Sequence, residues 1–160
     1  MIMRSRGFTY LTVLFVVAIM GAGLALVSEV WHTASMHEKE VELLFAGNQY
    51  RKAIERYCLS GAGQYPRSLE DLLRDARKPD TVRHLRRMYP DPMTGNSEWG
   101  IVRAPDGGIM GVRTTSNDKP FKTAGFRLRD RAFEGAAKYS DWIFAYSPTG
   151  QPATQKPPPR

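Results

Sequence analysis

Residues 8–27 read FTYLTVLFVVAIMGAGLALV, a run of twenty residues without a charged side chain. As an α-helix, this run rises about 30 Å, which matches the hydrocarbon thickness of a bilayer. Its apolar residues occupy every face of such a helix, whereas a helix of a soluble domain is normally apolar on one side. The sequence therefore predicts a transmembrane helix over residues 8–27.

Charge on the N-terminal side of this run indicates its orientation. Arg4 and Arg6 come just before it, and basic residues next to a membrane span are held in the cytoplasm. The predicted topology is N-terminus inside, with everything after residue 27 on the far side of the membrane. A cleaved secretory signal peptide is an alternative, because the small residues within 18–25 can imitate its cleavage site.

The junction at the start of the run carries a resemblance to a known family. Residues 6–19 read RGFTYLTVLFVVAI, which resembles the class III leader junction of type IV pilins and type II secretion pseudopilins. The resemblance implies a leader over residues 1–7, cut by a prepilin peptidase between Gly7 and Phe8, with Phe8 methylated as the new N-terminus. It also implies that the apolar helix stays on the chain and bundles with others in a filament.

Thr12 is the one departure from the family pattern at this junction. The fifth residue after the expected cut is normally a glutamate, whose carboxylate is thought to meet the N-terminal amine of a neighbouring subunit, but here it is Thr12. The Thr12 hydroxyl cannot form that ion pair and can bond back to the helix carbonyl one turn earlier. The departure favours a minor pseudopilin; a major, G-like subunit that has lost the glutamate is the alternative.

The helix is expected to continue through residues 28–60 as an amphipathic helix. Apolar residues at spacings of three and four predict a stripe that faces a folded domain; they are Val41, Leu44, Phe45, Ile54, Tyr57 and Cys58. Charged residues between them predict a solvated face: Glu38, Lys39, Glu40, Glu42, Arg51, Lys52, Glu55 and Arg56. The glycines at 61 and 63 predict the end of the helix.

Residues 61–147 are expected to form a periplasmic globular head. Ser68 and Asp71 predict a capping box on a short helix, whose buried side would hold Leu69, Leu72 and Leu73. Strands are expected over 98–103, 109–115 and 141–146, with a tight turn at 105–108. In the last strand, alternation places Trp142, Phe144 and Tyr146 on one face.

The predicted fold class is therefore α+β and pilin-like, with a long N-terminal helix, transmembrane in its first half, packed on a small antiparallel sheet. Residues 116–138 predict a long surface loop with one helical turn, suited to subunit contacts. The loop would be anchored by Phe121, Phe126, Leu128 and Phe133. Residues 148–160 are proline-rich and predict a disordered or extended tail.

Calcium is the only metal for which the sequence offers candidate ligands. Major secretion pseudopilins bind calcium in a C-terminal loop, and the resemblance implies that Ser116, Asp118 and Asp141 could supply oxygen ligands here. Solvated loop residues are the alternative reading. The three histidines lack the paired spacing of a zinc site, and the single Cys58 cannot form a disulfide within the chain. Burial on the apolar face of the helix is expected for Cys58.

The strongest cluster of basic residues is a candidate anion patch. The chain carries 23 Lys and Arg against 16 Asp and Glu, a net charge of +7, and Arg83, Arg86 and Arg87 lie close together in sequence. Arg74, Arg77 and Lys78 come shortly before them. Phosphate contacts are one interpretation. A solvated helix face, or a contact with acidic neighbours in a filament, is favoured over nucleic acid.

These observations favour a structural role. We find no catalytic dyad, nucleophile and base pair, or phosphate-cradling glycine loop in the sequence, so neither an enzyme nor a bound cofactor is expected. The leading interpretation is a pseudopilin of a type II secretion system, which joins a periplasmic pseudopilus through its N-terminal helix. The implied partners are other pseudopilins, the inner-membrane assembly platform and the prepilin peptidase.

Two other functions remain open. One is a minor type IV pilin of a surface or DNA-uptake pilus, and the other is a plain signal-anchored or secreted periplasmic binding protein. Residues 65–73 and 89–95 resemble the Tyr-Pro-x-x-Leu stretch and the Asp-Pro turn of secretion pseudopilins. These two resemblances favour secretion over a surface pilus.

Overall fold

The computed structural model describes the backbone of residues 6–148 and the side chains of residues 10–20 and 34–148. The chain divides into two compact units, Met1–Glu38 and Lys39–Arg160. Its elements are α1 (Arg6–Ser60), η1 (Glu70–Leu72), β1 (Gly100–Arg103), β2 (Ile109–Arg113), η2 (Leu128–Phe133), η3 (Tyr139–Asp141) and β3 (Phe144–Ala145). The first five residues of the expected leader, and the expected tail beyond Pro148, lie outside the described residues.

The first unit contains the N-terminal part of α1. All of residues 8–27 lie within this helix, and every side chain over residues 10–20 is exposed. No helix in the described part of the chain meets the length and apolarity needed to cross a membrane. The side chains of residues 8, 9 and 21–27, which belong to the expected span, lie outside the described residues.

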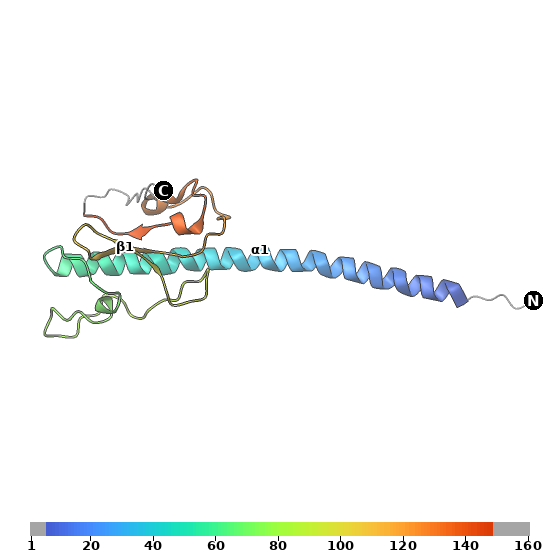
Figure 1. Cartoon of the computed structure of the whole chain (residues 1–160), viewed down its shortest axis with the longest axis horizontal. Coiled ribbons are helices and arrows are strands. Elements are labelled where there is room, and N and C mark those ends of the chain that lie inside the picture. The colour runs from blue at the N-terminus through green and yellow to red at the C-terminus, as the bar shows by residue number, and fades with distance from the viewer. Residues whose placement is uncertain (1–5, 149–160) are drawn as a thin grey trace, which may run out of the picture. The chain divides into compact units, whose positions relative to one another are not determined.

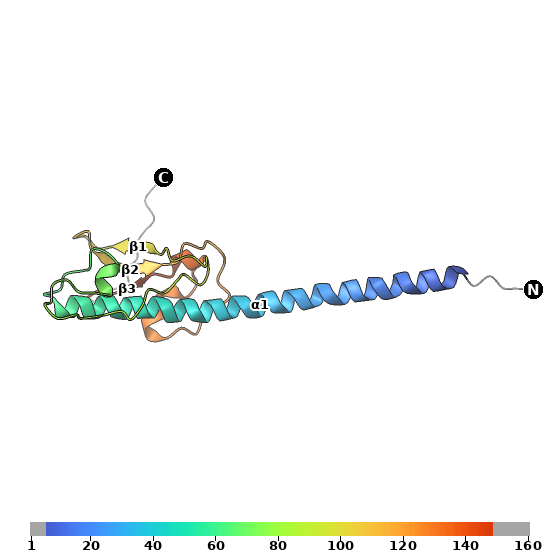
Figure 2. The ribbon, with the colours of Figure 1, turned by 90° about the horizontal axis from the view of Figure 1, so that it is seen from below.

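The second unit contains a three-stranded antiparallel sheet of order β1-β2-β3. Val102 of β1 pairs with Gly111 of β2, and Val112 of β2 pairs with Phe144 of β3. Figure 2 shows the strands lying alongside the C-terminal part of α1. In Figure 1 the segment before β1 and the segment after β2 leave the sheet on opposite sides of that part of the helix. The prediction of an α+β fold with a long helix and a small antiparallel sheet is confirmed.

The strands are shorter than predicted, most of all the last one. The turn between β1 and β2 forms as expected, with Ala104 N donating to Gly108 O at 2.9 Å and Gly107 at a φ of 83°. The expected start of the third strand instead lies in η3, where the Asp141 carboxylate accepts a bond from Lys138 N at 3.1 Å. This bond tightens the chain into a turn, so extended pairing begins only at Phe144.

Aromatic side chains form the centre of the second unit. Trp142 and Phe144 are fully buried, as their predicted shared face required. The ring of Phe133 stacks on Trp142, with centroids 5.4 Å apart, and Phe126 meets Trp142 edge to face at 5.3 Å. The prediction that Phe121 and Leu128 anchor the long loop is wrong, since their side chains are 53% and 85% exposed. η2 begins at Leu128 and turns it outward, so that Phe133 at its other end points inward.

The buried face of α1 is offset from the predicted stripe. Ile54, Tyr57 and Cys58 are buried as expected, but Val41 and Phe45 are 57% and 53% exposed. The residues buried in their place include Leu43, Ala46, Gly47 and Tyr50. The small residues Ala46 and Gly47 let the sheet approach the helix closely. The face of α1 that contains them is therefore buried, and the face that contains Val41 and Phe45 is exposed.

Two residues expected on the solvated face of α1 are instead enclosed. Glu40 is 1% exposed, and its Oε1 accepts bonds from Lys122 N at 2.8 Å and from the Tyr139 hydroxyl at 3.3 Å. The Arg51 side chain is 14% exposed and pairs with Asp130 at 2.7 Å. Both are tolerated because a buried charge is acceptable when hydrogen bonds compensate its loss of hydration.

The short helix after α1 is only partly as predicted. Asp71 does accept bonds from Arg67 N and Ser68 N, each at 3.0 Å. The N-cap of η1 is Leu69, however, and no side chain caps it. The Ser68 half of the expected capping box is therefore wrong. Leu69 and Leu72 are buried, while Leu73 is half-buried.

Gly47 is required by the close approach of the sheet to α1. A Cβ atom placed on Gly47 would lie against the Phe144 ring, closer than non-bonded atoms approach. Replacing Gly47 with alanine is expected to lower the free energy of unfolding by about 1–3 kcal/mol through overpacking, although alanine ordinarily stabilises a helix interior by about 1 kcal/mol over glycine. Chemical denaturation measures the change.

A second background gives this prediction a control. In a Phe144→Ala chain the ring is absent, so Gly47→Ala should there be neutral or stabilising. If Gly47→Ala changes the free energy of unfolding by the same amount in both backgrounds, the packing argument is contradicted.

Candidate functional site

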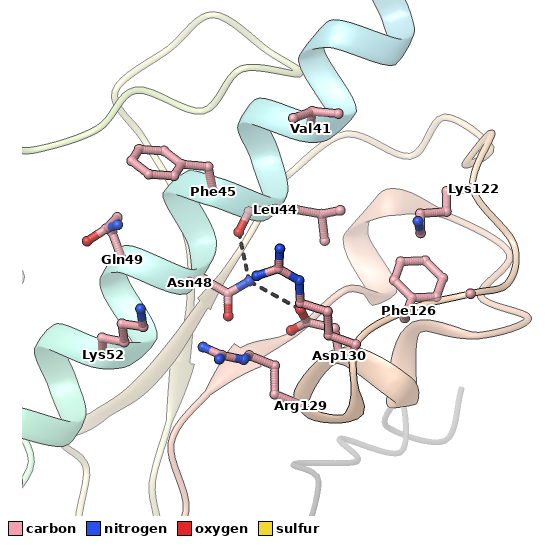
Figure 3. A pocket seen from close by; sticks show the side chains of 12 residues that line it. Val41, Leu44, Phe45, Asn48, Gln49, Lys52, Lys122, Phe126, Arg129 and Asp130 are labelled. Atoms are coloured by element: carbon pink, nitrogen blue, oxygen red, sulfur yellow. Dashed lines mark hydrogen bonds between the residues drawn. The ribbon is translucent and has the colours of Figure 1, made fainter.

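A groove between α1 and the loop before η2 is a candidate site in the second unit. It encloses about 520 Å³. The groove is lined by Val41, Leu44 and Phe45 of α1 and by Lys122 and Phe126 of the loop. Figure 3 shows Leu44 pointing toward Lys122 and Phe126, while the Phe45 ring extends from the other side of the helix. The exposed apolar side chains that the sequence assigned to the core therefore line this groove.

The groove carries an excess of positive charge. Its basic residues are Lys52, Lys122, Arg127 and Arg129. Asp130 is its only acidic lining residue, and the carboxylate of Asp130 is already paired with Arg51 at 2.7 Å and bonded to Asn48 Nδ2 at 3.3 Å. The Lys122 ammonium lies 5.2 Å from the centre of the Phe126 ring, where cation and ring attract one another.

This arrangement suits a protein segment that is both apolar and acidic. Phe45, Val41 and Phe126 offer apolar contact area, and the surrounding cations would steer and orient carboxylates. Sequence reasoning predicted subunit contacts on the 116–138 loop, and the loop does supply one wall of the groove. The helix wall was missed. Its signal was the second apolar face of α1, formed by residues 41, 44 and 45.

The predicted anion patch is divided by the structure into two environments. It lies on irregular chain between η1 and β1, so the alternative of a solvated helix face is wrong. Arg83, Arg86 and Arg87 are exposed and line one hollow together with Arg74. Arg77 points elsewhere: it donates to Asp75 and lies over the Tyr57 ring at 3.5 Å.

Asp75 is the centre of a buried polar network at the C-terminal end of α1. Its side chain is fully buried, and it accepts bonds from Arg77 Nη2 at 2.7 Å and Arg77 Nε at 2.8 Å. His84 Nε2 lies 3.1 Å from Asp75 Oδ2. The bonds from Arg77, and to a lesser extent the bond with His84, hold the pKa of the Asp75 carboxyl well below its ordinary value, although burial opposes this.

Arg77 connects this network to the end of the helix. It donates to Tyr57 O at 2.9 Å and to Gly61 O at 3.4 Å, and so satisfies carbonyl groups that a helix C-terminus leaves unpaired. A Cβ atom on Gly61 would meet the Arg77 guanidinium. The glycine that ends α1 is therefore also the residue that admits this arginine.

The three calcium candidates make bonds within their own turns. Ser116 Oγ bonds to Asp118 Oδ2 at 2.8 Å, and the Asp141 carboxylate accepts a bond from Lys138 N. Among the described residues, no group of three or more His, Cys, Asp or Glu side chains is placed to hold a metal ion. Cys58 is buried as predicted, and burial raises the pKa of its thiol to about 11.

The expected processing residues lie at the start of α1. Gly7 and Phe8 are in its first turn, and their side chains lie outside the described residues. Thr12 is exposed in the second turn. Comparisons with protein-family models, with curated proteins and with solved structures give no match. Function must therefore be argued from the residues and the geometry of this chain.

Proposed function

We propose that this chain is a pseudopilin of a type II secretion system, held in the bacterial inner membrane by residues 8–27 and cut by a prepilin peptidase between Gly7 and Phe8. Its head lies in the periplasm, and the N-terminal helix carries the subunit into a pseudopilus. Thr12, in place of the usual glutamate, favours a minor subunit. The leader junction at residues 6–19 is the observation that carries this proposal.

The exposed apolar side chains of α1 support insertion into lipid or into a bundle of like helices. Leu11, Leu14, Phe15, Ala18 and Ile19 form one continuous apolar surface, and all are exposed. Burying each large apolar side chain would contribute about 1.5–3 kcal/mol. A helix that presents so much apolar surface needs a partner, which the proposed membrane and pseudopilus provide.

The groove beside α1 supports a lateral contact between subunits. Its cations Lys52, Arg127 and Arg129 are exposed, as are the apolar side chains of Val41 and Phe45. The same helix carries exposed carboxylates at Glu38 and Glu42. A second copy, or a related pseudopilin, displaced along the helix axis can bring such carboxylates against the cations. The contact would be both apolar and complementary in charge.

Substitutions that place a polar or acidic side chain in the groove test this contact. Phe45→Ser and Arg129→Glu are expected to lower incorporation into the pseudopilus at least about tenfold, the effect of losing about 1.4 kcal/mol of contact energy. The measurement is the amount of chain recovered in sheared or cross-linked filaments, relative to the total in membranes, in a host with the complete secretion machine.

Matched controls lie on the same elements. Leu59 is 72% exposed on α1 and Arg131 is exposed in η2; neither lines the groove. Leu59→Ser and Arg131→Glu should therefore leave incorporation near the level of the unaltered chain. Equal losses for the groove and control variants would contradict the proposed contact surface, and a chain that never enters filaments would contradict the proposed function.

A further inference from the structure

Four arginines surround a hollow on the irregular chain between η1 and β1. The hollow is lined by Leu73, Thr81 and the arginines at 74, 83, 86 and 87, and encloses about 340 Å³. This is roughly ten times the volume of about 30 Å³ that one water molecule takes up in the liquid. It therefore has room for a small polyatomic anion and part of the group attached to it.

The backbone that carries these arginines is firmly held from beneath. His84 N and Leu85 N both donate to Leu72 O, at 2.9 and 2.8 Å, and the buried His84 ring contacts Asp75. Leu85 is 3% exposed. Because His84 and Leu85 point inward, their neighbours Arg83 and Arg86 point outward on a fixed frame.

The hollow has donors but no acidic counterpart. It has no carboxylate among its lining residues. Within the described part of the chain, no carboxylate oxygen lies within ion-pair distance of any of the four guanidinium groups. The Arg87 guanidinium lies 5.0 Å from the centre of the Tyr89 ring, which limits its freedom without neutralising it. Four like charges in one hollow repel one another, so an anion would relieve that repulsion.

The number and kind of donors favour phosphate over a carboxylate. One arginine satisfies a carboxylate through two parallel hydrogen bonds, whereas a phosphate dianion has three unprotonated terminal oxygens and two charges to share among several guanidinium groups. The Thr81 hydroxyl adds a further donor. We propose that this hollow is a binding site for a phosphate group, carried either by a free phosphate or monoester or by a lipid headgroup.

Binding to inorganic phosphate is the first test, and it uses the full-length chain in an uncharged detergent. Calorimetric titration is expected to show saturable binding, and phosphate should raise the unfolding midpoint above its value in chloride of equal ionic strength. The double substitution Arg83→Gln and Arg86→Gln should weaken binding at least tenfold, since it removes two charge-assisted contacts. Arg131→Gln makes a like change outside the hollow and should leave affinity unchanged.

Two further ligands identify the source of the phosphate. Tight binding of glycerol 3-phosphate with weak binding of glycerophosphoglycerol, a diester, would indicate a soluble phosphate or monoester. Comparable binding of the diester would support the site with a lipid headgroup as its source.

Three results would overturn the proposal. One is no gain in midpoint over chloride at equal ionic strength. Another is an equal loss of affinity in the Arg131→Gln control. The last is equal binding of a glutamate-rich peptide, which would make the hollow a docking surface for an acidic protein segment. The unfolding midpoints of the unaltered chain in phosphate and in chloride test the proposal even if the double variant fails to fold.

Discussion

Replacing Asp75 with alanine is expected to lower the free energy of unfolding by about 1.5–3 kcal/mol, the usual effect of losing hydrogen bonds to a charged group. The side chain is fully buried and accepts two bonds from Arg77. Without it, the buried ring of His84 loses its partner, and the guanidinium of Arg77, whose side chain is 27% exposed, loses its acceptor and turns to water. Arg77 would then also hold the last carbonyls of α1 less firmly.

Denaturant unfolding of the full-length chain, followed by the fluorescence of buried Trp99 and Trp142, measures this change. Asp80→Ala is the matched control, because Asp80 is an exposed aspartate of the same irregular segment. It should alter stability by no more than about 0.5 kcal/mol. A cost below 1 kcal/mol for Asp75→Ala would show that the network contributes little to the fold.

The same network predicts how stability depends on pH. The pKa of Asp75 is lower in the folded chain than in the unfolded chain, chiefly because Arg77 donates to the carboxylate. The ionised carboxylate therefore contributes its full stabilisation above the unfolded pKa, about 4, and loses it as the pH falls further. The unaltered chain should lose more stability between pH 5 and pH 2 than an Asp75→Asn chain. The same denaturant unfolding, repeated across this pH range, measures the difference.

Much of the fold could be predicted from the sequence because its signals are local. The end of α1 at Ser60 followed from the glycines at 61 and 63, and the hairpin followed from the turn residues at 105–108. Alternation within residues 142–146 gave the buried pair of Trp142 and Phe144. Each of these depends on a few neighbouring residues whose conformational preferences agree with the final structure.

The errors arose where distant segments meet. On α1, residues 41, 44 and 45 form an apolar face as convincing as the one that is buried. The close approach of Phe144 to Gly47 favours burial of the other face. Glu40 was predicted to be solvated because the two groups that donate to its carboxylate are distant in sequence. Lys122 N lies 82 positions away and the Tyr139 hydroxyl 99. No local pattern reports such contacts.

The candidate site was divided in the same way. Sequence proximity grouped Arg77 with Arg83, Arg86 and Arg87, but the structure gives Arg77 a buried partner in Asp75 and leaves the other three around the hollow. Arg74, noted only as an upstream neighbour, joins them. Clustering in sequence therefore found the charge but could not distinguish a structural arginine from one that is free to bind a ligand.

Replacing Gly7 with leucine is expected to abolish processing of the chain, the largest effect that the proposed function predicts. The resemblance of residues 6–19 to a prepilin leader junction implies that the peptidase requires the small residue before the cut. The variant should therefore remain a full-length precursor in membranes and stay out of filaments. Ser5→Leu makes an equally bulky change inside the leader, away from the cut, and should be processed normally.

The most direct test of the account is the N-terminus of the unaltered chain itself. The protein is purified from membranes of a host that has its prepilin peptidase and from a strain in which the peptidase is deleted, and each sample is examined by intact mass and N-terminal sequencing. The account predicts a chain that starts at methylated Phe8 in the first strain and at Met1 in the second. A chain that starts at Met1 in both strains, or near Ser28 in both, would contradict it.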